Sequence, residues 1–178
     1  MRAFVCGLVA IALLFGLALV GCDWRGTDTG VVELWITDAP AEYEVTSVLV
    51  DFVEAAIRET GQEGWTYLEL AGITRYDIIK LVGHEQLIAW AGVAAGSYSD
   101  VRLAVEKMEV VMTGDMEMVI VPSEPYVFEQ PFEVIRGETT IILLDFDVDK
   151  SVAITDEGDI SIKPIENIAV SVRQAEAE

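Results

Sequence analysis

The chain has few basic residues and almost no cysteine or histidine. Its 178 residues include 11 Lys and Arg against 31 Asp and Glu, which gives a formal net charge of −20 at neutral pH. Nucleic acids and anionic membrane surfaces attract proteins through faces rich in Lys and Arg, so this balance disfavours both as partners. It is compatible with cations and basic partners, although a solvated acidic surface is the simpler explanation.

Only two cysteines are present, Cys6 and Cys22, and both lie near the N-terminus. A domain that begins after them has no thiol for a disulfide, a nucleophile or a metal site. The single histidine, His84, lacks the Cys and His partners of a usual zinc site. No Gly-x-Ser-x-Gly elbow accompanies it either. We therefore expect His84 to be structural or to lie at the surface, and we expect no enzymatic activity.

No charged residue lies between Ala3 and Gly21, and this apolar stretch ends in Leu19-Val20-Gly21-Cys22. A small residue directly before a cysteine, with Leu three positions before that cysteine, matches the lipobox of bacterial lipoproteins. In that pattern the thiol is acylated and the chain is cut ahead of the cysteine. Met1-Arg2 supplies the basic start of an export signal. We expect residues 1–21 to be a lipoprotein signal peptide and Cys22 to be the lipidation site.

Two alternatives exist for this N-terminal segment. About 20 apolar residues can span a bilayer as a retained helix. An ordinary secretory signal needs a small-x-small cleavage site, which Leu19-Val20-Gly21 fits poorly. In the lipidated form, residues 22–30 are expected to be a polar tether. Cleavage ahead of Cys22 removes Arg2, which changes the formal net charge from −20 to −21. The expected location is the cell membrane or cell envelope, outside the cytoplasm.

From Val31 onward the apolar residues mostly have a period of two, which predicts half-buried strands. Three such sets are Val32, Leu34, Ile36; Val48, Val50, Phe52; and Val101, Leu103, Val105. Turn residues separate the strands at 38–40, 61–64, 113–115 and 156–159. The prolines at 122, 125 and 131 indicate an irregular connection or an edge strand.

The segment 77–92 departs from this alternation, because its apolar residues are irregularly spaced and Gly83 interrupts them. It predicts a strand end or turn near Ile78–Leu81 and a short helix near His84–Ala91. The fold expected for residues 31–174 is mainly β, an antiparallel β-sandwich of about eight strands with that one short helix. A closed β-barrel is the alternative. Residues 175–178 are expected to form a frayed tail.

Six segments of the chain resemble successive motifs of one known domain. They are Leu34–Pro40, Gly64-Trp65, Asp77–Leu81, Ala95–Tyr98, Leu143–Asp147 and Ile162–Pro164. Their order and spacing are similar to those of domain-of-unknown-function family four-three-eight-two, found in bacterial and archaeal envelope proteins. The resemblance covers about residues 31–172. It implies a β-rich exported domain that is usually lipid-anchored, with no established enzymatic activity.

Asp145, Asp147 and Asp149 alternate on what the pattern predicts to be one strand, so their carboxylates would share a face. Ca²⁺ takes six to eight oxygen ligands and would suit such a row, with Asp38, Asp156 or a backbone carbonyl completing the shell. An exposed acidic strand face is the alternative, and a turn role is the alternative for Asp38. An EF-hand is excluded, because Lys150 occupies the position where that loop needs Gly.

Trp35 and Trp65 are the candidate binding residues for a sugar or peptide. Trp35 lies opposite the alternating aliphatic residues of its strand, and Trp65 follows a glycine turn. The alternative is that both rings cover sheet edges or the core. The predicted function is therefore a non-enzymatic, lipid-anchored module that binds a protein or a glycan. A calcium-stabilised structural module and an envelope hydrolase are the other hypotheses.

Overall fold

The computed structural model describes residues 28–38, 45–114, 116–154, 160–162 and 167–175. Strands account for most of them, so the prediction of a mainly β chain is confirmed. The strands are β1 (Thr29–Asp38), β2 (Val45–Glu59), β3 (Thr66–Leu70), β4 (Arg75–Asp77), β5 (Gln86–Ala94), β6 (Gly96–Met112), β7 (Met116–Ile120), β8 (Tyr126–Val134), β9 (Thr139–Phe146), β10 (Val152–Ile154), β11 (Ile160–Ile162) and β12 (Ile168–Gln174). Helix within the described ranges is limited to the 3₁₀ turn η1 (Ile78–Leu81) and the short α1 (Val148–Ser151).

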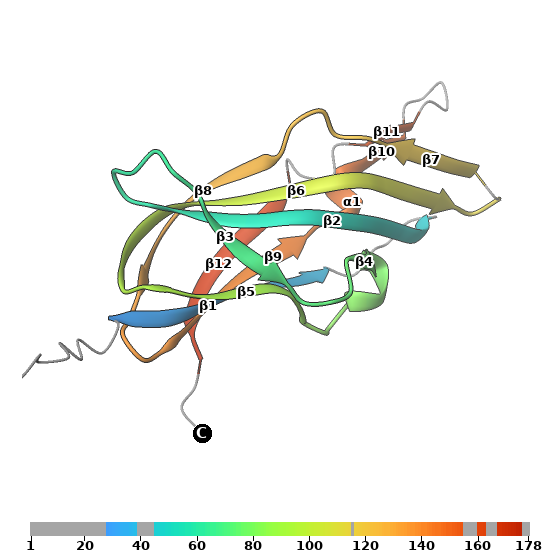
Figure 1. Ribbon diagram of the computed structural model, residues 1–178. Coiled ribbons are helices and arrows are strands. Elements are labelled where there is room, and N and C mark those ends of the chain that lie inside the picture. Colours follow the sequence, from blue (N-terminus) through green and yellow to red (C-terminus); the bar gives the residue numbers. More distant parts are fainter. Residues whose placement is uncertain (1–27, 39–44, 115, 155–159, 163–166, 176–178) are drawn as a thin grey trace, which may run out of the picture.

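Ten of the strands form a single sheet in the order β12-β9-β1-β5-β3-β2-β6-β7, with β4 paired to β2 and β8 paired to β6. β10 and β11 form a separate hairpin. β3 joins the two halves of the large sheet, because its first residues pair with β2 and its last two pair with β5. The sheet curls so that the β12-β9-β1-β5 half lies opposite the β2-β6-β8 half (Figure 1).

The prediction of an antiparallel sandwich needs correction. β1 and β9 run parallel, while the other ladders between these strands are antiparallel, so the sheet is mixed. It forms a curled half-barrel. The alternation of apolar residues reports which face of a strand is buried, but it does not report the direction of the neighbouring strand. The parallel pair was therefore not readable from the sequence.

The core lies inside the curl and receives alternate residues from each half. The three predicted sets of alternating apolar residues are all buried, and Val32, Leu34 and Ile36 have no exposed surface at all. The aromatic residues buried in this core are Phe52, Tyr76, Tyr98, Phe132 and Phe146. Tyr98 and Phe132 stack with ring centroids 5.2 Å apart, which joins β6 to β8. Burial of these aliphatic and aromatic side chains is the main stabilising contribution to the fold.

The helix predicted near His84–Ala91 is wrong, because this segment forms most of strand β5. Leu34 pairs with Ala89 and the next residue, Trp35, pairs with Leu87, so Ile88 is an extra residue in a β-bulge. Ile88 and Ala89 are consequently both buried, which breaks the period of two. The turn predicted near Ile78–Leu81 is confirmed as η1.

The predicted turns lie where strands end. β2 ends and β3 begins on either side of residues 61–64, and Met112 pairs with Met116 across the 113–115 turn. Ile154 pairs with Ile160 across residues 155–159, which lie outside the described part. Pro131 lies in β8, whose described ladder is with β6 alone, so the edge-strand prediction is confirmed. Within the described residues, no helix has the length and hydrophobicity to cross a bilayer.

Candidate binding surface

The three tryptophans in the described part of the chain lie on the outer face of the sheet, away from the core. Trp35 alternates with the buried Leu34 and Ile36 of β1, and Trp90 of β5 is 43% exposed. Trp65 packs against arginines that project outward from β2 and β6. The aromatic residues in the core are Phe and Tyr instead. This distribution makes the outer face the candidate binding surface.

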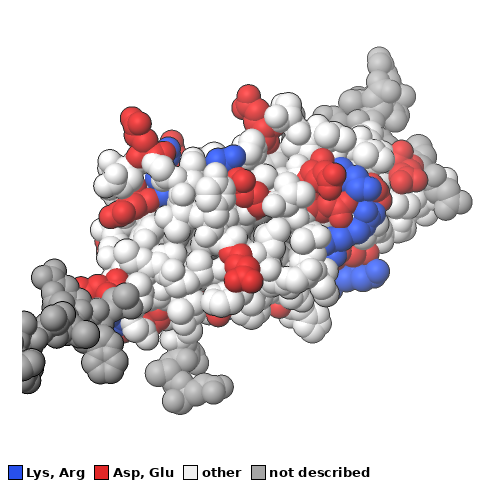
Figure 2. All heavy atoms as spheres, in the orientation of Figure 1, with Lys and Arg blue, Asp and Glu red and all other residues white. Residues whose placement is uncertain are grey.

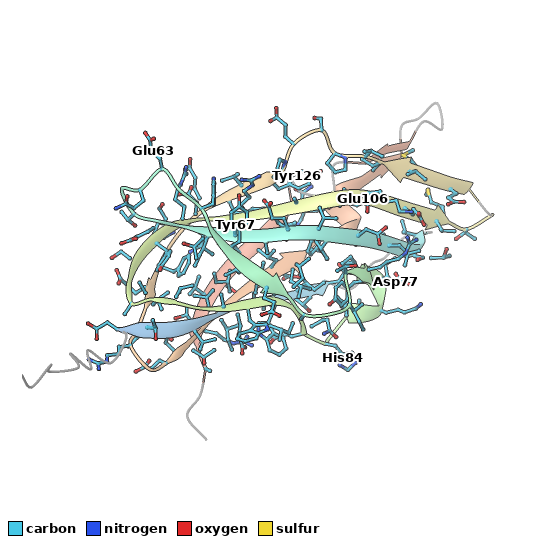
Figure 3. All side chains as sticks on the ribbon, in the orientation of Figure 1. Glu63, Tyr67, Asp77, His84, Glu106 and Tyr126 are labelled. Carbon is cyan, nitrogen blue, oxygen red and sulfur yellow. The ribbon has the colours of Figure 1, made fainter. Side chains whose placement is uncertain are left out.

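Strand register arranges three of these outer aromatics in a diagonal line, the aromatic row: Trp35, Trp90 and Tyr67. Glu33 of β1 pairs with Trp90, and Trp90 pairs with Glu69 of β3. Trp35 lies two residues after Glu33, in the direction of the start of β5. Tyr67 lies two residues before Glu69, which is the opposite direction along the sheet, so the three rings form a diagonal. Tyr67 is 58% exposed and projects from the outside of the sheet (Figure 3).

Carboxylates stand between the rings of the aromatic row. Glu33 and Glu69 are the direct cross-strand neighbours of Trp90, one on each side. The indole N–H of Trp35 donates a hydrogen bond of 2.9 Å to Glu33 Oε2. This bond uses one lone pair of the carboxylate and holds the Trp35 ring in place. The surface therefore combines aromatic faces with acceptors of hydrogen bonds.

Gly92 leaves open space beside Trp90. It lies two residues further along β5, on the same outer face. A Cβ built on Gly92 would meet no heavy atom within 4 Å. Trp90 therefore borders an uncrowded stretch of backbone on its own strand.

Trp65, at the end of the 61–64 turn, is held by two arginines. The guanidinium carbon of Arg58 lies 4.8 Å from the ring centroid, and that of Arg102 lies 5.5 Å from it. Both arginines are ion-paired, Arg58 to Asp100 at 2.8 Å and Arg102 to Glu54 at 3.1 Å. A cation over an indole ring is attracted to its electron-rich face. The two ring contacts hold Trp65 on the outer face, and the carboxylates of Asp100 and Glu54 neutralise the two arginines.

Charge on this side of the molecule is uneven. Figure 2 shows separate acidic groups on a largely uncharged surface, with Lys and Arg gathered mainly toward one end. At that end Arg75 contacts Asp51 at 3.0 Å, and Lys107 contacts Glu109 at 2.7 Å. The Lys107 ammonium, followed by Arg75, lowers the pKa of the Glu109 carboxyl. These cations already have acidic partners in the fold.

The structure separates the residues predicted to hold calcium. β9 ends at Phe146, so the premise of one strand carrying all three aspartates is wrong. Asp147 instead precedes α1, where its Oδ1 accepts a 3.0 Å hydrogen bond from the backbone N–H of Lys150. Its carboxylate also pairs with the Lys150 ammonium. Hydrogen bonding to that ammonium, and then to the backbone N–H, lowers the pKa of Asp147.

Asp145 and Asp38 lie on opposite faces of the sheet. Asp145 pairs with Thr37 on the outer face, whereas Asp38 shares the inner face with Phe146 and is 3% exposed. Burial, and then the neighbouring Asp147, raise the pKa of Asp145. Its Oδ1 is buried and has no hydrogen-bond partner among the described residues.

The side chain of Asp149, as well as Asp156, lies outside the described part of the chain. The described side chains include no group of three His, Cys, Asp or Glu that could hold a metal ion. Calcium binding therefore stays a prediction.

His84 is exposed, as expected of a surface residue. Its backbone carbonyl accepts a 2.9 Å hydrogen bond from Thr37 Oγ1, which ties the loop before β5 to β1. Cys22, the predicted lipidation site, lies outside the described residues.

Sequence reasoning selected Trp35 and Trp65 among the aromatic residues of the chain and ranked Trp90 and Tyr67 below them. Trp90 was assigned to the expected helix, where it could not be placed on a sheet face. Placing 86–94 in a strand next to Val31–Ile36 would have put Trp90 beside Glu33. Tyr67 alternates with the buried Leu68 in a five-residue strand too short to give a clear period.

Comparison with known proteins gives a single result. A family model described as "Domain of unknown function (DUF4382)" matches residues 29–164. No curated protein and no solved structure gives a significant match to this chain.

Proposed function

Since this chain belongs to the DUF4382 family, we propose that it is a cell-envelope lipoprotein with a non-enzymatic binding function. The lipobox Leu19-Val20-Gly21-Cys22 supports the anchor. Each buried CH₂ of an acyl chain contributes about 0.8 kcal/mol, so two or more chains on Cys22 give stable attachment. The first described residue, Asp28, is six positions after Cys22. β1 begins at Thr29, so the last two residues of the expected tether belong to the sheet. At about 3.5 Å per residue, the remaining segment from Cys22 to Asp28 spans at most roughly 20 Å.

The observation that carries a binding function is the aromatic row on the outer face. Large rings contribute most to stability when they are buried, yet Trp90 and Tyr67 are 43% and 58% exposed. Exposed apolar residues that lie together, next to polar groups, are typical of binding surfaces. The same face carries Trp65, fixed by its two arginines. The proposed binding site is therefore this outer face, and the proposed ligand is either a protein or a glycan.

Mass spectrometry of the protein purified from membranes tests the anchor. We expect the mature chain to begin at Cys22 and to carry acyl chains, and we expect Cys22→Ser to abolish this modification. Cys6→Ser is the matched control, because Cys6 lies inside the predicted signal peptide and its removal leaves the lipobox intact. A chain with Met1 in place and an unmodified Cys22 thiol would contradict the proposal.

A further inference from the structure

We propose that the aromatic row, with Glu33 and Glu69, binds a neutral, hydroxyl-rich polysaccharide. This inference deepens the binding function proposed above by naming the ligand class. The site consists of Trp35, Trp90 and Tyr67 on three adjacent strands, with the two carboxylates on either side of Trp90.

The row has the length of an oligosaccharide, not of a single sugar. Diagonal neighbours on adjacent strands lie about 7–8 Å apart, so three rings in a diagonal line span roughly 15 Å. A sugar ring presents C–H groups on its face and hydroxyl groups around its rim. Aromatic faces of Trp and Tyr provide a complementary surface for the former, and carboxylate oxygens accept hydrogen bonds from the latter. The alternation of rings and carboxylates therefore matches the surface of a sugar chain.

The carboxylates favour a glycan over a protein partner. The buried centres of protein interfaces are depleted in charged residues, and Glu and Asp are under-represented there. A protein covering Trp90 would also desolvate Glu33 and Glu69, which is costly unless each gains a cationic partner. Sugar hydroxyls can donate to both carboxylates, and hydrogen bonds to an ionised acceptor are stronger than neutral ones. Water that bridges a bound glycan and the carboxylates lowers the cost of desolvating the carboxylates further.

Charge restricts the glycan to a neutral one. The net charge of the chain is −20, so an acidic polysaccharide is repelled at long range. The arginines on this face already have acidic partners. Arg58 and Arg102, beside Trp65, are paired with Asp100 and Glu54. Arg173 of β12, in register with Glu33 through Ile141 of β9, is paired with Glu85. These three guanidinium groups therefore offer little attraction to an acidic sugar.

Affinity electrophoresis of the full chain in detergent tests this inference. The gels contain hydroxyethyl cellulose, glucomannan, laminarin or glycol chitin as neutral polymers, and polygalacturonate as the acidic one. We expect retardation by at least one neutral polymer and none by polygalacturonate. Trp90→Ala is expected to weaken the apparent affinity about tenfold, the effect of losing one aromatic contact.

Two further variants make the result specific. Gly92→Leu fills the open space beside Trp90 without meeting a neighbouring atom at Cβ, so it is expected to block retardation while the melting temperature is retained. Ile73→Ala, at a 63% exposed apolar residue between β3 and β4, is the matched control and is expected to bind as the wild type does. Retardation that survives both Trp90→Ala and Gly92→Leu would overturn the proposed site.

Absence of retardation in all four neutral gels would overturn the polysaccharide assignment. A photo-crosslinking residue placed at position 67 then distinguishes failure of the polysaccharide assignment from failure of the binding function itself. Crosslinking to an envelope protein in cells would leave the binding function standing with a protein as its ligand. Absence of both retardation and crosslinking would remove the binding function together with the polysaccharide.

Discussion

Asp145 and Asp147 are two residues apart, yet the fold shifts the pKa values of their carboxyls in opposite directions. Burial raises the pKa of Asp145, and the ammonium of Lys150 lowers that of Asp147. A raised pKa means that folding stability falls as the pH rises through the carboxyl range. A lowered pKa means that the contribution is present above the unfolded pKa and is lost as the pH falls. The two residues therefore oppose each other in the pH dependence of stability.

Isosteric variants separate these effects. At neutral pH we expect Asp145→Asn to raise the melting temperature, because it removes a poorly solvated charge beside Asp147. We expect Asp147→Asn to lower it, because the pair with Lys150 is lost while Asn still serves as a helix N-cap. Thermal melts followed by circular dichroism should show both differences shrinking at acid pH, where the carboxyls are protonated. A lower melting temperature for Asp145→Asn at neutral pH would contradict this account.

Gly30 is a position where the fold has no room for a side chain. A Cβ there would lie 2.4 Å from the carbonyl oxygen of Ile135 and 2.8 Å from Val134 Cγ1. We expect Gly30→Ala to lower the free energy of unfolding by about 1–3 kcal/mol, the usual cost of overpacking. Gly92→Ala is the control, because its Cβ meets no atom within 4 Å. Urea denaturation compares the two, and equal stabilities would show that the start of β1 can shift away from β8.

At the level of elements, the alternating strands were predictable and the bulged one was not. β1 could be read from Val32, Leu34 and Ile36 because every second residue faces the core. In β5 the extra residue Ile88 inserts into the ladder, and two consecutive residues become buried. Such spacing imitates part of a helical period, and sequence alone has no signal for the partner strand that causes it. Because of this bulge, the sequence pattern placed Trp90 in a helix and not on the sheet face beside Glu33.

The bulge also sets which residues of β5 matter for stability. Ile88 has no exposed surface, whereas the adjacent Leu87 lies opposite Trp35 on the outer face and is only half-buried. We expect Ile88→Ala to cost about 2–5 kcal/mol in the free energy of unfolding, as other large-to-small core substitutions do. Leu87→Ala is expected to cost clearly less. Chemical denaturation measures both, and a larger loss for Leu87→Ala would place the bulge elsewhere in the strand.

For the whole molecule, composition and periodicity predicted the class of fold but not its connections. The sequence shows that strands have one buried face, and the structure adds that β9 lies parallel to β1. That pairing joins residues more than a hundred positions apart, such as Val31 and Thr139. It depends on how the whole sheet curls, which no local pattern reports. The premise of the calcium hypothesis was wrong for a local reason, because β9 ends at Phe146 and α1 begins at Val148, so the three aspartates do not share one strand.

The composition of β8 affects what happens when two copies of the chain meet at this edge of the sheet. Its outward side chains include Glu129, Pro131 and Glu133, all exposed. Proline cannot donate to a new ladder, and like charges on two approaching copies repel each other. This border of the sheet is therefore a poor template for a strand from a second copy, and we do not expect copies of the chain to join into fibres through it.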